Sequence, residues 1–500
     1  MESFVSILVL VLLFWAALAL SATLWSYLLS PLKVFPGPVA ARYTNFWRFR
    51  DVVRGNCQNT HIKLHRKHGT AVRMGPNTIS LSDPNLINTV FSTKTLWKKS
   101  AMYGVKEPIV DGRSVPNLFS TRDENWHSFY MRPIAPLYSM TKLLELEHCI
   151  DEMIVCFTKK LTERFAETLN VCNMDQYLLY FSWDLMNKIT FGEDLGILDA
   201  GKDVTGFLEI SAQDSDYFAR TSQIPRLHRL LSQNRFLRFG PPAMDWAVVL
   251  GTTALQKRQA NGPPEKPDFL EKLLGVRSKY SDIIDDNMMI TYLLNNLIAG
   301  SDTTANLLCA TIYYVLKNPN VHEKLSMECA SLETPVSWKK AQQLPYLDAV
   351  MREAMRIHPG AALMLERVVP EGGLTLPDGR YIPEGTIVGM NPWVVNRDEA
   401  VFGPEPDRFI PERWMKQIHE TEAEFQTRRS KMKSCELSFG AGKRACLGKR
   451  LSQLESYKLI ATLFSTFEMG LSFPSDEWKV TNSWFVRNEN IRVTLKSRSQ

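Results

Sequence analysis

The chain has 500 residues, of which 45% are hydrophobic and 22% are charged, a composition typical of a globular protein. Its formal net charge of +6 is small, and no basic stripe with interleaved aromatic residues is present, which argues against a nucleic-acid-binding protein. The eight cysteines include no C-x-x-C pair and do not suggest a disulfide framework. We therefore expect a large folded protein in a reducing compartment that faces the cytosol.

The chain begins with an apolar stretch, residues 4–29, that contains no charged residue and exceeds the roughly 20 residues that a helix needs to span a bilayer. Basic residues follow this stretch and only Glu2 precedes it, so the positive-inside rule places the rest of the chain in the cytosol. A signal peptide cleaved near Ala19 is the alternative, but a basic n-region is missing and the apolar run continues. We predict a single-pass membrane anchor over residues 1–30 and a proline-rich hinge over residues 31–40.

Residues 41–500 show mainly helical patterns and contain neither an internal repeat nor a long polar linker. The longest uninterrupted helical pattern runs from about Asp285 to Lys317. Short β-type patterns occur at residues 71–82, 374–388 and 481–495. We expect one large, mainly α-helical domain with small β-sheets.

The long predicted helix contains the sequence Ala299-Gly300-Ser301-Asp302-Thr303. A glycine inside a helix costs about 1 kcal/mol relative to alanine, which is tolerated where something must approach the backbone. A threonine hydroxyl can bond the carbonyl one turn back and bend the helix. We expect Gly300 and Thr303 to open a groove in this helix; the alternative is a simple kink beside a solvated aspartate.

Two charged residues, Glu353 and Arg356, are spaced so that they share one face of a helix and can form an ion pair. Taken alone, such a pair usually belongs to a solvated helix face. Its meaning depends on the motifs that accompany it.

Near the C-terminus the chain reads Phe439-Gly-Ala-Gly442-Lys-Arg444-Ala-Cys446-Leu-Gly448, or F-x-x-G-x-R-x-C-x-G. Glycines allow backbone amides to come close to a sulfur atom, and such amides stabilise a metal-bound thiolate. The alternative is a glycine-rich turn that carries a buried free cysteine. The five fixed residues in this order favour a metal-binding thiolate.

In this order, A-G-x-D-T, E-x-x-R, the segment Pro411-Glu-Arg413-Trp414 and the cysteine loop resemble the cytochrome P-450 family of haem-thiolate monooxygenases, of the microsomal type. Segments at residues 116–123 and 138–147 are similar to fungal pisatin-demethylase-like members. The resemblance implies the cytochrome P-450 fold for residues 41–500, haem b as cofactor, and a location in the endoplasmic reticulum membrane. The chain has no glycine-rich nucleotide fingerprint, so NADPH would act through a separate flavoprotein reductase.

The resemblance also implies roles for individual residues. Cys446 would ligate the haem iron, Asp302 and Thr303 would relay protons to dioxygen, and Glu353, Arg356 and Arg413 would form a buried structural network. The residues expected to contact the haem are Phe439, Gly440, Gly442, Arg444, Gly448, Arg367, Ala299, Gly300 and His127.

This chain departs from the family at one propionate-binding position. Many members carry a tryptophan and an arginine in an early helix, where both reach a haem propionate. Here His127 stands in place of the tryptophan and Met131 in place of the arginine. Histidine still offers a donor to a propionate, whereas methionine does not.

The fold implied by the resemblance also indicates a substrate pocket, although each of its residues is equally plausible as plain core. Most of its side chains are apolar or aromatic, as suits a small lipophilic substrate. The expected lining is Tyr103, Phe119, Tyr292, Asn295, Asn296, Ala362, Leu363, Trp484 and Phe485.

We expect a membrane-anchored monooxygenase that uses dioxygen to hydroxylate, epoxidise, desaturate or demethylate a small lipophilic molecule of fungal specialised metabolism. The alternatives are a haem-thiolate isomerase or dehydratase that needs no reductase, and a haem-binding protein without turnover. The Asp302–Thr303 pair argues against both, because neither activity requires proton delivery to dioxygen.

Overall fold

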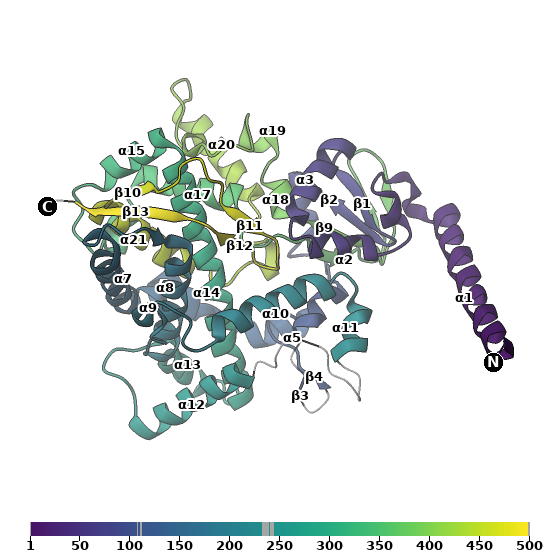
Figure 1. The fold of residues 1–500 in the computed structure, drawn as a ribbon, viewed down its shortest axis with the longest axis horizontal. Coiled ribbons are helices and arrows are strands. Elements are labelled where there is room, and N and C mark those ends of the chain that lie inside the picture. Colours follow the sequence, from purple (N-terminus) through teal and green to yellow (C-terminus); the bar gives the residue numbers. More distant parts are fainter. Residues whose placement is uncertain (1, 108, 111–112, 233–239, 241–244, 499–500) are drawn as a thin grey trace.

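The computed structural model describes residues 2–107, 109–110, 113–232, 240 and 245–498. In this part of the chain, helices surround the long helix α14, and the small sheets lie at the periphery (Figure 1). The longer helices are α1 (Glu2–Leu29), α2 (Phe46–Val53), α3 (Cys57–His68), α5 (Glu124–Met131), α7 (Glu147–Leu161), α8 (Met174–Phe191), α10 (Phe207–Thr221), α11 (Pro225–Ser232), α12 (Asp245–Asn261), α13 (Phe269–Arg277), α14 (Asp286–Lys317), α15 (Pro319–Cys329), α17 (Pro345–Ile357), α20 (Glu422–Cys435) and α21 (Lys449–Thr466).

The strands are β1 (Ala71–Gly75), β2 (Thr78–Leu81), β3 (Ile109–Val110), β4 (Arg113–Ser114), β5 (Cys172–Asn173), β6 (Leu365–Val368), β7 (Leu374–Thr375), β8 (Tyr381–Ile382), β9 (Ile387–Met390), β10 (Phe467–Leu471), β11 (Lys479–Thr481), β12 (Arg487–Glu489) and β13 (Arg492–Ser497). All three β-type sequence patterns contain strands. The predicted class, mainly helical with small sheets, is confirmed.

Helix α14 is the predicted long helix, and both of its ends follow from the sequence. The side chain of Asp285 caps its first turn by accepting a hydrogen bond from the amide of Met288 at 2.8 Å. Pro319 begins the next helix, and the residue before a proline is disfavoured in the helical conformation. Apolar side chains lie on nearly all sides of α14, so the helix is buried, and it packs most extensively against α8.

The largest sheet has four strands in the order β1-β2-β9-β6. The β1–β2 hairpin is antiparallel, β2 pairs in parallel with β9, and β9 pairs antiparallel with β6. Strand β6 carries Arg367 opposite Val388, and an isolated bridge joins Arg367 to Lys99. The sheet thereby fixes the position of one predicted haem contact.

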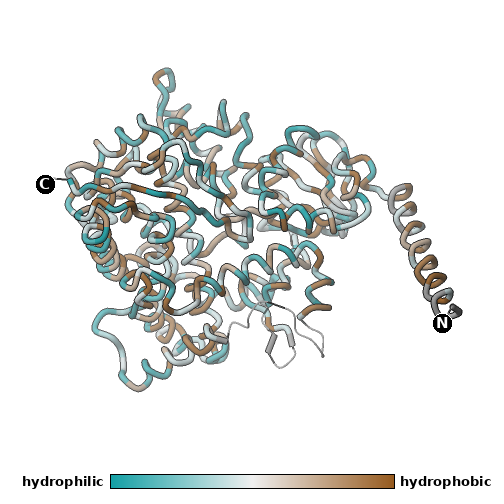
Figure 2. The backbone as a smooth tube through the Cα atoms, in the orientation of Figure 1, coloured by the Kyte–Doolittle hydropathy of each residue, from teal (hydrophilic) through white to brown (hydrophobic). Residues whose placement is uncertain are grey.

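Helix α1 projects away from the domain at the end that carries the four-stranded sheet (Figure 1). Its apolar side chains are exposed where they are described, among them Leu10, Phe14 and Trp15. The tube of this helix carries much of the brown colour that marks hydrophobic residues (Figure 2). Within the described residues, no helix is both long enough and apolar enough to cross a membrane.

The segment after α1, predicted to be a hinge, packs on the domain. The amide of Arg73 in β1 donates to the carbonyl of Pro36 at 2.7 Å, and the Arg73 guanidinium donates to the hydroxyl of Ser30. A Cβ at Gly37 would lie 2.2 Å from the Arg73 carbonyl oxygen, so only glycine allows this approach. The segment is therefore a strap bound along β1.

Candidate active site

The cysteine loop connects α20 to α21 and depends on two glycines with positive φ. Gly440 and Gly442 have φ values of +67° and +66°, a region that other residues seldom adopt. A Cβ at Gly442 would lie 1.9 Å from the carbonyl oxygen of Phe91. The amide of Cys446 donates to the carbonyl of Phe439 at 2.8 Å and closes the loop. This backbone presents the Cys446 sulfur at the start of α21.

Cys446 differs from the other seven cysteines, because it alone has an exposed side chain. Desolvation by the surrounding protein raises the pKa of its thiol, while the amides of Gly448 and Lys449 hydrogen-bond to the sulfur and lower it, together with the Lys449 charge. The predicted approach of amides to the sulfur is thus present. A reachable sulfur held by two amide donors is suited to a thiolate ligand of iron.

One face of α14 carries Asn295, Ala299 and Thr303, which are spaced one helical turn apart. The Thr303 hydroxyl donates to the Ala299 carbonyl at 2.7 Å, as expected for a threonine that loosens the helix ladder. Ala299 is exposed although it lies within the central helix. This face therefore borders an accessible space.

Asp302 is held by two side chains from other helices. The indole nitrogen of Trp183 in α8 donates to Oδ1 at 2.9 Å, and the hydroxyl of Ser211 in α10 donates to Oδ2 at 2.8 Å. Burial raises the pKa of Asp302 above its usual value, although both hydrogen bonds lower it. The carboxyl is therefore more readily protonated than a solvated aspartate. Sequence reasoning missed Trp183 and Ser211, because nothing near either residue marks it as a partner of α14.

Gly300 has a different neighbour from the one expected. A Cβ at this position would lie 2.6 Å from the terminal methyl group of Met186 in α8. The glycine thus permits close packing of α14 against α8. Its contribution to a groove beside the haem stays a prediction.

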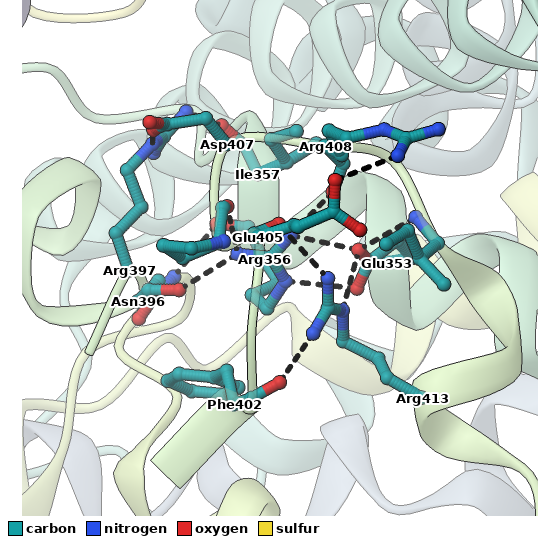
Figure 3. A network of polar contacts seen from close by, with 12 residues as sticks. Glu353, Arg356, Ile357, Asn396, Arg397, Phe402, Glu405, Asp407, Arg408 and Arg413 are labelled. Carbon is teal, nitrogen blue, oxygen red and sulfur yellow. Dashed lines mark hydrogen bonds and ion pairs between the residues drawn. The ribbon is translucent and has the colours of Figure 1, made fainter. Parts of the chain in front are cut away.

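The predicted Glu353–Arg356–Arg413 network is confirmed (Figure 3). Both side chains of the Glu353–Arg356 pair have 0% exposure, and their atoms approach to 2.7 Å. Nε of Arg413 donates to Glu353 at 2.9 Å, and the Trp414 indole donates to the same carboxylate at 2.9 Å. Burial would raise the pKa of Glu353, but the two guanidiniums and the Ile410 amide outweigh it and lower the pKa. The carboxylate is therefore ionised in the interior.

Several predicted pocket residues form one aromatic cluster. The rings of Tyr103, Phe119 and Trp484 pack edge to face, with centroids 5.4–6.3 Å apart. Leu363 and Phe485 pack in the same cluster. Phe218 of α10, which sequence reasoning missed, completes it at 5.1 Å from Trp484. These predicted residues therefore lie together, and their role in lining a substrate pocket stays a prediction.

Three predicted pocket residues are used elsewhere in the core. The hydroxyl of Tyr292 donates to the Tyr130 carbonyl. The side-chain amide of Asn296 donates to the Thr190 hydroxyl and accepts from the Tyr138 hydroxyl. Ala362 packs in a separate cluster with Ile62 and Trp393. These hydrogen bonds tie Tyr292 and Asn296 to neighbouring parts of the chain, and their place in the pocket lining stays a prediction. Ala362 packs toward α3, and its place in the pocket lining also stays a prediction.

The predicted propionate contacts lie near one another. Arg444 pairs with Glu124 at 3.0 Å and donates to the carbonyls of Leu118 and Thr121. Burial, Arg444 and Lys99 lower the pKa of His127 to about 3, so this imidazole is neutral. Arg367 is 5% exposed and packs over the Phe91 ring. The propionate roles of His127, Arg367 and Arg444 stay predictions.

The helical fold, the cysteine loop and the acid–threonine pair in α14 define a haem-thiolate class of protein. The family model described as Cytochrome P450 matches residues 36–494. The chain therefore belongs to the cytochrome P450 family.

Three similar proteins come from fungi. The cytochrome P450 monooxygenase cicH of Emericella nidulans is 38% identical over 94% of both chains. Cytochrome P450 monooxygenase cfoH of Aspergillus candidus is 36% identical over 98% of this chain and 93% of its own. The mpaDE protein of Penicillium roqueforti, also named a cytochrome P450 monooxygenase, is 32% identical over 94% of this chain and 56% of its own. The protein is a haem-dependent oxidoreductase of this family.

Replacing Glu353 by glutamine should destabilise the protein strongly, because it leaves two buried guanidiniums without their counter-charge. We expect a loss of about 3–5 kcal/mol in the free energy of unfolding, measured by chemical denaturation. The lowered pKa adds a pH signature: the stabilisation is present above the unfolded-state pKa and is lost as the pH falls through the lower folded-state value.

The matched control is Glu405→Gln, because Glu405 and Arg408 form a pair with the same i,i+3 spacing but are 53% and 69% exposed. This control should leave the denaturation midpoint nearly unchanged. An equal effect of both substitutions would contradict a special role for the buried network.

Proposed function

We propose that this protein is a membrane-attached monooxygenase that binds haem b through Cys446 and oxidises a small lipophilic molecule of fungal specialised metabolism. Electrons would come from a separate NADPH-dependent flavoprotein reductase. The observation that carries the proposal is the exposed Cys446 sulfur with its two amide donors. The fungal relatives named as monooxygenases support the reaction type.

A thiolate-ligated haem supplies electron density that favours cleavage of the O–O bond. The chain's own residues would supply protons for that cleavage. The Thr303 hydroxyl donates to Ala299 and keeps its lone pairs for a water molecule on the accessible face of α14. The raised pKa of Asp302 suits a group that takes up a proton and passes it on.

The substrate pocket would combine aromatic walls with one polar contact. Phe119, Phe218 and Trp484 offer edge-to-face packing for a lipophilic substrate. The buried Nδ2 of Asn295 has no hydrogen-bond partner among the described residues, and Asn295 shares the face of Thr303. A substrate with one hydrogen-bond acceptor would satisfy this amide, because buried polar groups are rarely left unpaired.

The reductase would dock beside the cysteine loop. A positive surface attracts an acidic partner and accelerates its association. Basic residues around the loop are exposed to solvent, namely Lys431, Lys433, Lys443, Lys449 and Arg450.

Attachment to the endoplasmic reticulum membrane would use α1, with the catalytic domain on the cytosolic side. The exposed apolar side chains of α1 support this role. The basic residues that follow α1 favour the cytosolic orientation.

Replacing Cys446 by alanine should abolish product formation and the carbonyl difference spectrum of a thiolate-bound haem, because the sulfur ligand is removed. Cys435→Ala is the control, since Cys435 lies at the end of α20 and outside the loop. The control should keep the spectrum. A Cys446→Ala protein that retains the thiolate spectrum would refute the assignment.

Replacing Thr303 by alanine should separate NADPH consumption from product formation. Proton-transfer assistance typically contributes on the order of a hundredfold or more, so product per NADPH should fall sharply while peroxide rises. The control is Thr311→Ala, because the Thr311 hydroxyl makes the same one-turn bond, to Leu307 at 2.8 Å, deeper in α14. If both variants form similar amounts of product per NADPH consumed, Thr303 only bends the helix.

Removal of residues 1–29 should leave a folded, haem-loaded protein that binds membranes more weakly. The cut is placed before Ser30, because its hydroxyl caps the next turn and accepts from Arg73. Flotation with lipid vesicles, compared with the full chain, measures the change. Undiminished binding, or a full-length protein secreted with a trimmed N-terminus, would count against the anchor.

A further inference from the structure

Three cationic side chains lie close together on the side of the cysteine loop that faces α5. Lys99 and Arg367 are 6% and 5% exposed, and the side chain of Arg444 is 4% exposed. Lys99 and Arg367 stand opposite each other in an isolated β-bridge. Arg444 lies two residues before Cys446.

The described acidic groups around this cluster do not balance its charge. Glu124 pairs with Arg444 at 3.0 Å. Glu366 is already paired with Arg48 and accepts a hydrogen bond from Ser100. When all three side chains are protonated, three cations against the one carboxylate of Glu124 leave two positive charges in the interior. Buried charges are costly unless a counter-charge accompanies them, so the cluster is suited to a ligand with two negative charges.

Of the three side chains, Lys99 is the one whose charged form its surroundings disfavour most. Burial lowers its pKa well below the usual value, and Arg367 and Arg444 lower it further, while Glu124 only partly opposes them. Its Nζ donates to the Phe119 carbonyl at 2.6 Å and lies 4.3 Å from the centre of the Tyr103 ring. One of its three N–H donors is used by that carbonyl, so two remain for an anion.

The haem that this family binds carries two propionates, which matches the two uncompensated charges. Arg367 and Arg444 are predicted propionate contacts, and Lys99 lies within their cluster. His127 is buried and neutral there and adds a donor but no charge. Met131 packs against the hydrophobic core at the position where many members have an arginine. Lys99 therefore offers this cluster a cation, which Met131 cannot.

We propose that Lys99 is a haem propionate ligand and that it replaces the arginine that Met131 displaces. This inference rests on the proposed haem-binding function. It assigns a cofactor contact to a residue whose sequence surroundings, Trp97-Lys-Lys-Ser100, contain no haem motif.

The test compares how fast purified variants lose haem and haem dimethyl ester to an excess of apomyoglobin. Esterification removes the propionate charges, so the wild-type protein should lose the ester faster than haem. Lys99→Met should accelerate the loss of haem by roughly 10- to 100-fold, the range expected for a hydrogen bond to a charged group, with little effect on the ester. The rate of ester loss divided by the rate of haem loss should therefore fall toward one.

Lys98→Met is the matched control, because it removes the same charge from the neighbouring, exposed residue. It should keep the wild-type ratio. Lys99→Gln removes the charge but keeps a donor for the Phe119 carbonyl, so it provides the same test if the methionine variant does not fold. Adding Met131→Arg to Lys99→Gln should raise the ratio again.

A wild-type ratio in a folded Lys99 variant would overturn the proposal, and a ratio that stays low after Met131→Arg would overturn the exchange between the two positions. Failure of the proposed function would look different, because the wild-type protein would then lack the carbonyl difference spectrum of a thiolate-bound haem. A normal spectrum with an unchanged ratio would refute only the role of Lys99.

Discussion

The geometry of the cysteine loop depends on the buried carboxylate of Glu353. A charge without solvent exposure persists only when its hydrogen-bonding capacity is filled, and donors from Arg356, Ile410, Arg413 and Trp414 fill it. The Arg356 guanidinium also donates a hydrogen bond to the Asn396 carbonyl at 3.0 Å.

The side chain of Asn396 connects this network to the start of the cysteine loop. Its side chain accepts from the Leu437 amide at 2.9 Å and donates to the Ser438 hydroxyl at 3.1 Å. Ser438 immediately precedes Phe439, where the loop begins. Hydrogen bonds through Asn396 thus link an ion pair in α17 to the backbone that presents the sulfur. The buried network therefore helps to fix the position of Cys446.

The sequence predicted the framework better than the pocket, for a physical reason. Helix α14 was predictable because an aspartate cap, a long apolar pattern and a following proline define its ends. The partners of its side chains were not predictable, because they come from parts of the chain that are distant in the sequence. Tyr292 donates to the Tyr130 carbonyl in α5, and Asn296 donates to the Thr190 hydroxyl in α8. Trp183, Ser211 and Lys99 were missed because their partners are distant in the sequence.

The strap along β1 has a mechanical consequence for a protein attached through α1. Residues 30–38 are bonded to the sheet, so the connection between α1 and the domain contains little free chain. A short tether samples few orientations, whereas a long flexible one samples many at lower local concentration. The domain would therefore rest on the bilayer by its sheet edge in a restricted set of poses, and the same part of its surface would always meet the lipid.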